Sequence, residues 1–513
     1  MKESLNNVED IDLEKEGIIK NKLNKYIIII PIIAILIVIV IITISIVFLL
    51  DKKSNDITIN DEKNINEEKN DEKEDSNQND DKNKEDSTTN KIGENDECLE
   101  WKNNECISCN YRYELINGTC KATFSVKALY ETDNDNENIK LIYNSNKKNI
   151  IDIEIDKEKV DPCINYTFKL AGNHTVYIRL NISNTEKIYA MFCEIEKLKS
   201  IYFTKEFDTK NIKYMEELFM DSRNLVSVDI SNLNTKNVED MSKMFSGCFS
   251  LKSVKPPNSE NINLINIEHM FDSCIELTSI DLSNFNTQVV KTMNSLFSNC
   301  YKLTTLNISN FNTQNVETMN RMFDNCTSLQ SISLSNINTK KLKEMKYMFR
   351  GCCSLTSIDL SNLNNTKLEI MESMFEKCNS LKFVNFSYFN TENVESMKSL
   401  FNGCTSLKSI DLSYFNTKEV KNMERMFLNC VSLTSIDLSN FYIPKINNMN
   451  YMFNECCNLT YLDISQFNLN SNENFHQFLT GLPSNGTIIV RSSDEKKIIK
   501  KILTEWEIKV INK

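Results

Sequence analysis

Cysteine is the residue whose type and spacing in this sequence could most directly support chemistry. A thiol recurs every 26 residues in the second half of the chain, and such a column could form disulfides, hold a metal or pack as small apolar groups. Each thiol would have two equivalent neighbours and nine cannot all pair. We therefore predict free, buried thiols, with Cys353 or Cys457 as the alternatives for a bond elsewhere. The nine are Cys248, Cys274, Cys300, Cys326, Cys352, Cys378, Cys404, Cys430 and Cys456.

Aspartate recurs at an outward strand position of the same repeats, and a column of carboxylates could bind Ca2+. The acids do not all fall on adjoining repeats and each lacks a second clustered acid, so we predict a solvated face instead. Serine flanks the acids with little variation, which favours weak, repeated contacts that gain strength from avidity. The candidate binding face comprises Asp281, Asp359, Asp411, Asp437 and Asp463, with Asp229 at the same position of an earlier repeat.

Motifs for catalysis are sparse. His174, His269 and His476 are far apart in the sequence, and no glycine-rich phosphate loop, nucleophile elbow or metal-binding helix motif occurs. We predict that the protein is not an enzyme and needs no cofactor. The net charge of −12 argues against nucleic acid as a partner, because such binding needs dense lysine and arginine.

A phenylalanine column positions these residues, because it recurs every 26 residues without insertion. Self-similarity at a fixed period of this size predicts a stacked solenoid, in which each unit buries its apolar face only against its neighbours. We place the solenoid at residues 206–467. The column is Phe219, Phe245, Phe271, Phe297, Phe323, Phe349, Phe375, Phe401, Phe427 and Phe453, and Leu479 continues it.

Each repeat has the pattern of a short strand followed by a short helix, which makes the fold class α/β. In residues 277–303, Leu277, Ile280 and Leu282 have the strand spacing of a leucine-rich repeat. Thr287 is placed to cap a helix with one apolar face, formed by Val290, Met293, Leu296 and Phe297. Glycine or asparagine at the predicted helix end tolerates the left-handed conformation. These residues are Gly247, Asn299, Asn325, Gly351, Gly403 and Asn429.

The repeated text, MF–C–SL–SIDLSNFNT–V–M, resembles the BspA-like leucine-rich-repeat surface proteins of bacteria and of parasitic or commensal protists. Met319 to Leu334 and Met423 to Leu438 are typical units. The resemblance covers about residues 206–467 and implies cell-surface adhesion to host cells or matrix proteins, with no catalytic residues to transfer. Lys255-Pro256-Pro257 departs from the strand pattern, so we expect an irregular turn of the solenoid there.

A cysteine-rich module at 97–121 precedes the repeats. Four cysteines in so short a segment predict two disulfides that staple a module too small for a core. The alternative is a zinc site that uses all four thiolates. The segment resembles EGF-type and growth-factor-receptor modules, whose usual order implies that the first cysteine pairs with the third and the second with the fourth. The cysteines are Cys98, Cys106, Cys109 and Cys120.

Residues 122–205 alternate apolar and polar residues between Asn/Asp clusters, which predicts a small all-β domain that caps the solenoid. Cys163 and Cys193 are its only cysteines and form a candidate disulfide, the alternative being two free buried thiols. Sequons beyond the predicted membrane segment are candidate glycosylation sites, and those at Asn117 and Asn173 are in turn-like text. They are Asn117, Asn165, Asn173 and Asn181.

An uncharged segment at Tyr26–Leu50 predicts a transmembrane signal anchor, because its 25 residues can span the bilayer core as a helix. The apolar run is longer than that of a cleaved signal peptide. Residues 1–25 are then a cytosolic tail and 51–96 a disordered charged stalk. The cysteines beyond the helix favour an exterior C-terminal side, so we expect a single-pass plasma-membrane protein.

The C-terminal segment, 468–513, is predicted to cap the last repeat. We expect a helical stretch at Glu495–Leu503 and burial of Trp506 against the last turns near Leu462 and Ile464, with an exposed ligand-contacting Trp506 as the alternative. The hypothesis for function is an anchored surface protein whose solenoid binds extracellular protein or glycan ligands. The alternatives are a receptor that signals through a partner subunit and a structural surface spacer.

Overall fold

A computed structural model describes residues 98–102, 105–109, 113–116, 119–122, 124–258, 262–282, 285–363, 365–469 and 477–511. The predicted cytosolic tail (1–25), transmembrane segment (26–50) and charged stalk (51–96) lie outside these residues. Within the described ranges, no helix has the length and apolar character that a membrane span requires.

Two short antiparallel strand pairs are described between residues 98 and 122. Strand β1 (Cys98–Lys102) pairs with β2 (Glu105–Cys109), and β3 (Tyr113–Ile116) pairs with β4 (Thr119–Ala122). The backbone register of the first pair sets Cys98 opposite Cys109. The structure describes the backbone of these strands but not their side chains. The two disulfides predicted for this module therefore stay a prediction.

The segment that follows is built of strands, but it is not separate from the solenoid. A seven-stranded sheet has the order β13-β12-β11-β5-β10-β7-β8, and its solenoid strands β12 and β13 are parallel to β11. Strand β5 pairs with β10 on one side and with β11 on the other, both antiparallel. The bounds are β5 (Val126–Thr132), β6 (Glu137–Lys140), the 3-10 helix η1 (Asn144–Asn149), β7 (Ile150–Ile155), β8 (Glu158–Val160), β9 (Asn165–Phe168), β10 (Gly172–Leu180), β11 (Leu198–Phe203), β12 (Ser227–Asp229) and β13 (Ser253–Lys255).

The solenoid therefore begins before the predicted boundary at residue 206. Phe192 stacks on Phe219 with ring centroids 5.9 Å apart and planes 15° apart. Lys187 forms a parallel bridge to Tyr214, the first of a column of bridges that continues to Asn448. Phe192 lies 27 residues before Phe219, one residue more than the period of 26. A strict 26-residue spacing therefore does not predict this first turn.

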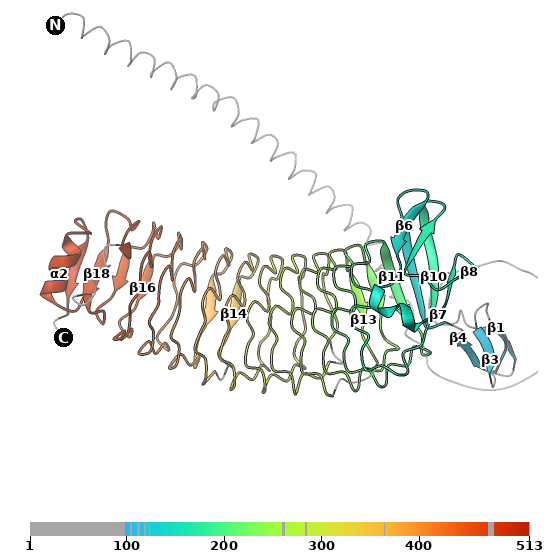
Figure 1. Ribbon diagram of the computed structural model, residues 1–513. Helices are drawn as coiled ribbons and strands as arrows, with labels where there is room; N and C mark the ends of the chain where they lie inside the picture. The colour runs from blue at the N-terminus through green and yellow to red at the C-terminus, as the bar shows by residue number, and fades with distance from the viewer. Residues whose placement is uncertain are drawn as a thin grey trace, which may run out of the picture. The chain divides into compact units, whose positions relative to one another are not determined.

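Figure 1 shows the repeats stacked one on the next, with short strands at intervals of the period. The later strands are β14 (Ser357–Asp359), β15 (Phe383–Asn385), β16 (Ser435–Asp437) and β17 (Tyr461–Asp463). Strand β13 ends at Lys255, next to the two prolines, and is the edge of its sheet. A proline has no N–H to donate to a ladder, but the next three repeats also form no strand in their described residues and contain no proline, so the prolines alone do not explain where this sheet ends.

The helix predicted in every repeat is wrong. In the segment predicted to be helical, every second backbone N–H donates to a carbonyl of the next repeat and not to one of its own repeat. For example, the Phe297 N–H bonds to the Met322 carbonyl at 3.0 Å. The amides between them close tight turns, as when Ser298 donates to Ser295 at 3.2 Å. The non-glycine residues Ser295 and Asn299 have φ of 53° and 59°, which no α-helix accommodates.

The residues chosen as helix ends do adopt the predicted left-handed conformation. From Gly247 to Asn429 the six positions have φ between 58° and 77°. Glycine and asparagine tolerate this region. The left-handed conformation is therefore predicted correctly, although these residues lie in tight turns and not at helix ends. Thr287 does not cap a helix; its hydroxyl donates to the Asn312 carbonyl at 3.1 Å and accepts from the Asn312 N–H at 2.8 Å. The repeats are thus turns of a solenoid joined by backbone and side-chain ladders.

The phenylalanine column forms a continuous stack in the core. Successive rings from Phe219 to Phe453 lie 5.3 to 5.9 Å apart with planes within 11° of parallel. The cysteine column is fully buried beside it. Such offset stacking adds to the burial energy of each ring, so every repeat is bound to two neighbours through the same column.

The C-terminal segment continues the solenoid sheet and covers its end. Strands β18 (Thr487–Val490) and β19 (Glu507–Val510) extend the order β16-β17-β18-β19, and helix α2 (Ser493–Lys500) lies between them in sequence. Trp506 is 2% exposed, and its indole N–H donates to the Pro483 carbonyl at 2.9 Å. The predicted burial of Trp506 is confirmed. Ser492 caps α2 by accepting from the Glu495 N–H.

Candidate binding surface

The predicted binding face follows the outward strand positions, and a local turn positions Asp359, Asp411, Asp437 and Asp463. Oδ1 of Asp411 accepts the Ser413 N–H at 2.9 Å, and Asp437 accepts from Ser439 at 2.8 Å. This bond closes the turn that ends each strand. The recurrent Asp-x-Ser text therefore has a structural cause. Because the turn itself favours this motif, its repetition along the face is weaker evidence for repeated ligand contacts than the sequence alone suggests.

Two of these turns also lower the pKa of the carboxyl group that they hold. The serine hydroxyl and N–H that bond to Asp359 and Asp411 hold the pKa of each carboxyl below its usual value. Asp281, Asp359, Asp411 and Asp437 are exposed, as a binding face requires. Asp463 is only 9% exposed and is not available to a ligand; β18 extends the sheet beside its strand.

The strand face also carries large aromatic side chains that are absent from the predicted binding face. All lie in the later repeats, and Tyr388 and Tyr414 are nearest neighbours with ring centroids 5.6 Å apart. Their departure from the repeat consensus is the signal that could have found them. The exposed set is Phe383, Tyr388, Tyr414 and Tyr461.

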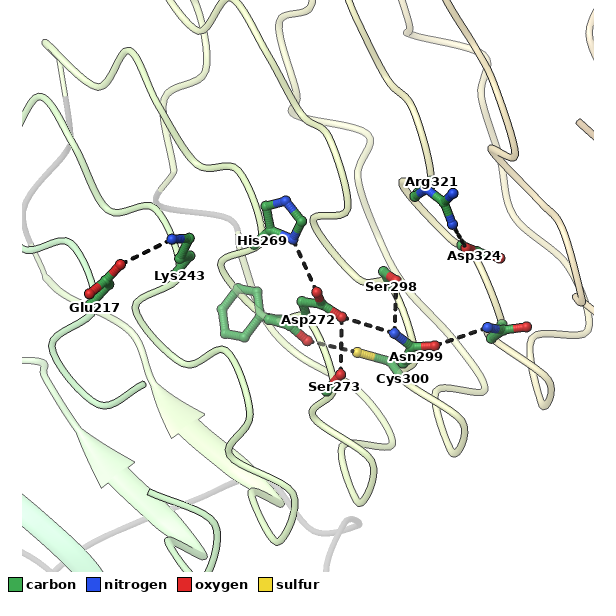
Figure 2. Close-up of polar contacts among 12 residues, drawn as sticks. Glu217, Lys243, His269, Asp272, Ser273, Ser298, Asn299, Cys300, Arg321 and Asp324 are labelled. Atoms are coloured by element: carbon green, nitrogen blue, oxygen red, sulfur yellow. Dashed lines mark hydrogen bonds and ion pairs between the residues drawn. The ribbon is translucent and has the colours of Figure 1, made fainter. Parts of the chain in front are cut away.

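A second polar surface, which we call the turn face, follows the left-handed residues on the tight turns. Figure 2 shows side chains of this face bonded from one repeat to the next. Asn299 donates to Asp272 at 3.1 Å and accepts from Asn325 at 2.9 Å, and His269 bonds to Asp272 at 3.0 Å. Burial alone would raise the pKa of Asp272, but the bonds from His269, Asn299 and Ser273 outweigh it and lower that pKa.

A charged cluster lies further along the turn face. The buried carboxylate of Asp324 accepts from Arg350 at 2.7 and 2.6 Å and from Arg321 at 3.0 Å. Both guanidinium groups flank the Tyr347 ring, with Cζ atoms 4.4 and 4.8 Å from its centroid. A bidentate pair with a buried carboxylate is strong, so these side chains are fixed to one another and join adjacent repeats.

The cysteine column consists of free thiols, as predicted. Each Sγ donates to a backbone carbonyl 29 residues earlier, as Cys300 does to Phe271 at 3.1 Å. Burial raises the pKa of the column thiols, that of Cys456 to about 12. Neither Cys353 nor Cys457 is bonded to another cysteine.

The predicted disulfide between Cys163 and Cys193 is not present, because both are free thiols. Cys193 is buried in the first turn of the solenoid, whereas Cys163 is half-buried beyond the end of β8. Burial raises the pKa of Cys193 to about 11. The alternative of two free thiols therefore holds.

Three of the four candidate glycosylation sites can be placed. Asn165 on β9, Asn173 on β10 and Asn181 just after β10 are exposed, whereas Asn117 lies outside the described residues. Exposure is a requirement for modification, and their use stays a prediction.

The histidines have structural surroundings. His174 on β10 is buried and bonds to Asp156 at 2.6 Å. His269 belongs to the turn face, and His476 lies outside the description. Within the part of the chain that the structure describes, no group of three His, Cys, Asp or Glu residues is arranged to hold a metal ion.

These features define a repeat-solenoid protein whose outward strand positions and turn face are its two extended polar surfaces. Matches to one family model cover residues 164–274, 265–384 and 370–488, which together span more than half of the 513 residues. The chain belongs to this family, whose description is "Mycoplasma protein of unknown function, DUF285". The matched span contains the predicted solenoid, 206–467. No curated protein sequence matches the chain.

Several solved structures are similar to this chain, among them these three. A leucine-rich repeat protein from Bacteroides ovatus is 22% identical, with 69% of this chain and 91% of that chain covered and a TM-score of 0.41. A leucine rich cell surface protein from Faecalibacterium prausnitzii is 18% identical over 56% and 83% of the two chains, with a TM-score of 0.30. A TLR13–ssRNA13 complex gives 17% identity over 59% and 50%, with a TM-score of 0.22.

The family match supports the repeat part of the resemblance that the sequence indicates. The EGF-like module is not covered by the family match, which begins at residue 164. That module stays a prediction.

Proposed function

We propose that this chain is a single-pass plasma-membrane protein whose extracellular solenoid binds protein or glycan ligands on host cells or matrix. The stacked repeats of the family support surface recognition, because a solenoid of this kind presents an extended surface to a partner. The uncharged Tyr26–Leu50 segment supports the anchor.

The observation that carries the proposal is the exposure of the same outward position on repeat after repeat. Asp359 and Asp411 are both exposed and ionised on one strand face. A face of this kind is longer than a small molecule and suits a polymer or a macromolecule. Individually weak contacts along it combine through avidity.

Adhesion of cells that display the full chain tests the proposal. Such cells should bind saturably to host cells or to a matrix-coated surface, and cells that display a chain ending at residue 121 should not. Protease added to intact displaying cells should remove the solenoid and leave a small membrane-bound remnant. Adhesion equal to the truncated control would leave the structural spacer as the better account, and full protection from protease would refute the topology.

A further inference from the structure

One column of the strand face changes its residue type in two adjacent repeats. Asparagine occupies this column in most other repeats and joins them: Asn310 donates to the Leu282 carbonyl at 3.1 Å, and Asn440 donates to that of Leu412 at 3.0 Å. Tyrosine takes the place at 388 and 414. A tyrosine has no amide to make this bond, so the two repeats give up a structural contact in exchange for an aromatic ring.

The two rings are presented to solvent. Tyr388 is 79% exposed and Tyr414 is 45% exposed, with their centroids 5.6 Å apart. Tyr388 also has φ of 63°, which is an outlier for a bulky residue. We call Tyr388 and Tyr414 the tyrosine pair.

Aspartate occupies the outward strand position in the repeat of Tyr414 and in the repeats on either side of the tyrosine pair. Asp411 lies on the same turn as Tyr414. Asp359 occupies the equivalent strand position one repeat before that of Tyr388, and Asp437 occupies it one repeat after that of Tyr414. In the repeat of Tyr388 the uncharged Asn385 replaces aspartate, and its Oδ1 accepts the Ser387 N–H at 3.1 Å in the same kind of turn. The turn therefore does not require aspartate, and the carboxylates add a negative charge that the fold does not need.

Cations are absent from the outward positions of these repeats. We count four outward positions in each repeat, namely the first and third residues of the strand and two residues of the following turn. None of these positions from Ser357 to Asn440 is lysine or arginine. Lys382 and Lys408 are one position before two of these strands. The outward positions are consequently aromatic and acidic, with the exposed Lys382 and Lys408 next to them, and charge complementarity at the outward positions selects a basic occupant.

We infer that the tyrosine pair and its flanking aspartates bind a lysine- or arginine-rich segment of a partner protein. The face of a tyrosine ring attracts an ammonium or guanidinium group, and the adjacent carboxylates pair with the remaining charge. The inference rests on the proposed role in surface recognition and assigns that role a ligand chemistry and a place.

Binding of a defined peptide tests the inference on the full chain in detergent. The probe is a short fluorescent peptide of alternating lysine and serine, and its control is the same peptide with every lysine acetylated. The variant is Tyr388→Asn with Tyr414→Asn, which restores the residue of the other repeats and so should fold. Tyr301→Asn is the matched control, because Tyr301 is 39% exposed outside this column.

The wild-type chain should bind the lysine peptide saturably and the acetylated peptide far more weakly. The double variant should lose about tenfold in affinity for the lysine peptide, and Tyr301→Asn should change nothing. Asp411→Asn should weaken binding and reduce its salt dependence.

Equal binding by the wild-type chain and the double variant would overturn the inference, and so would equal binding of the two peptides. A neutral oligosaccharide that binds the wild-type chain but not the double variant would assign the pair to a glycan instead. If cells displaying the double variant adhere normally while peptide binding is also unchanged, the inference fails and the proposed surface recognition stands.

Discussion

Removal of one ring from the phenylalanine stack should loosen the solenoid locally. Phe349 is fully buried, with Phe323 and Phe375 stacked on its two sides at 5.4 and 5.7 Å. Phe349→Leu keeps most of the apolar volume and loses two aromatic pairs, about 1–3 kcal/mol in total at about 0.5–1.5 kcal/mol each. Phe349→Ala also leaves a cavity and should cost about 3–5 kcal/mol.

Hydrogen exchange is the suitable assay, because a repeat array need not unfold as a single unit. The Phe323 and Phe349 amides donate to carbonyls of the following repeat at 2.9 Å, so their exchange reports local opening. Exchange should rise most around residue 349, fall off over the neighbouring repeats and be unchanged near Phe245. A uniform rise along the whole stack, or equal effects of Leu and Ala, would refute the nearest-neighbour account of stability.

Three further predictions follow from named contacts. Alkylation of the unreduced chain should modify the column thiols, such as Cys274, only after denaturation, because burial keeps them protonated and inaccessible; mass spectrometry that finds disulfides between repeats would contradict this. Trp506→Ala should cost about 3–5 kcal/mol and lower the melting temperature, whereas loss of cell binding at an unchanged melting temperature would place Trp506 in a ligand site. The pKa of Asp272 is lower in the folded chain than the unfolded value of about 3.9, so its carboxylate stabilises the fold above that pH, and this stability is lost as pH falls through the folded pKa. Asp272→Asn should therefore reduce the acid dependence of the free energy of unfolding. An unchanged acid dependence would refute this account.

The periodic residues predict most of the architecture. A fixed spacing of phenylalanine is enough to establish that units stack, since no single unit can bury its own ring. It does not say how the backbone between two rings is bonded. The apolar spacing of Val290, Met293 and Phe297 is that of a helix face, yet these residues also point inward from successive tight turns whose amides bond to the next repeat.

The candidate site was less accessible to sequence reasoning. The sequence around Asp411 fits a binding motif and a turn motif equally well, and the structure shows the turn through the bond from Ser413 N–H to Asp411. The tyrosines at 388 and 414 were visible as exceptions to the repeat. Their meaning depends on what the consensus asparagine does, and that required the contact from Asn440 to the preceding repeat.

The alternate amides of the tight-turn segments point the same way along the stack. Met241, Lys243 and Phe245 donate to the following repeat, and Met293, Ser295 and Phe297 do the same two repeats later. Each such peptide unit has a dipole, and dipoles in one direction add. The two ends of this ladder are consequently unlike: one offers acceptors and the other donors. Whole repeats can be gained or lost in the middle without altering either end, but a terminal segment that closes one end of the ladder has the wrong polarity to close the other.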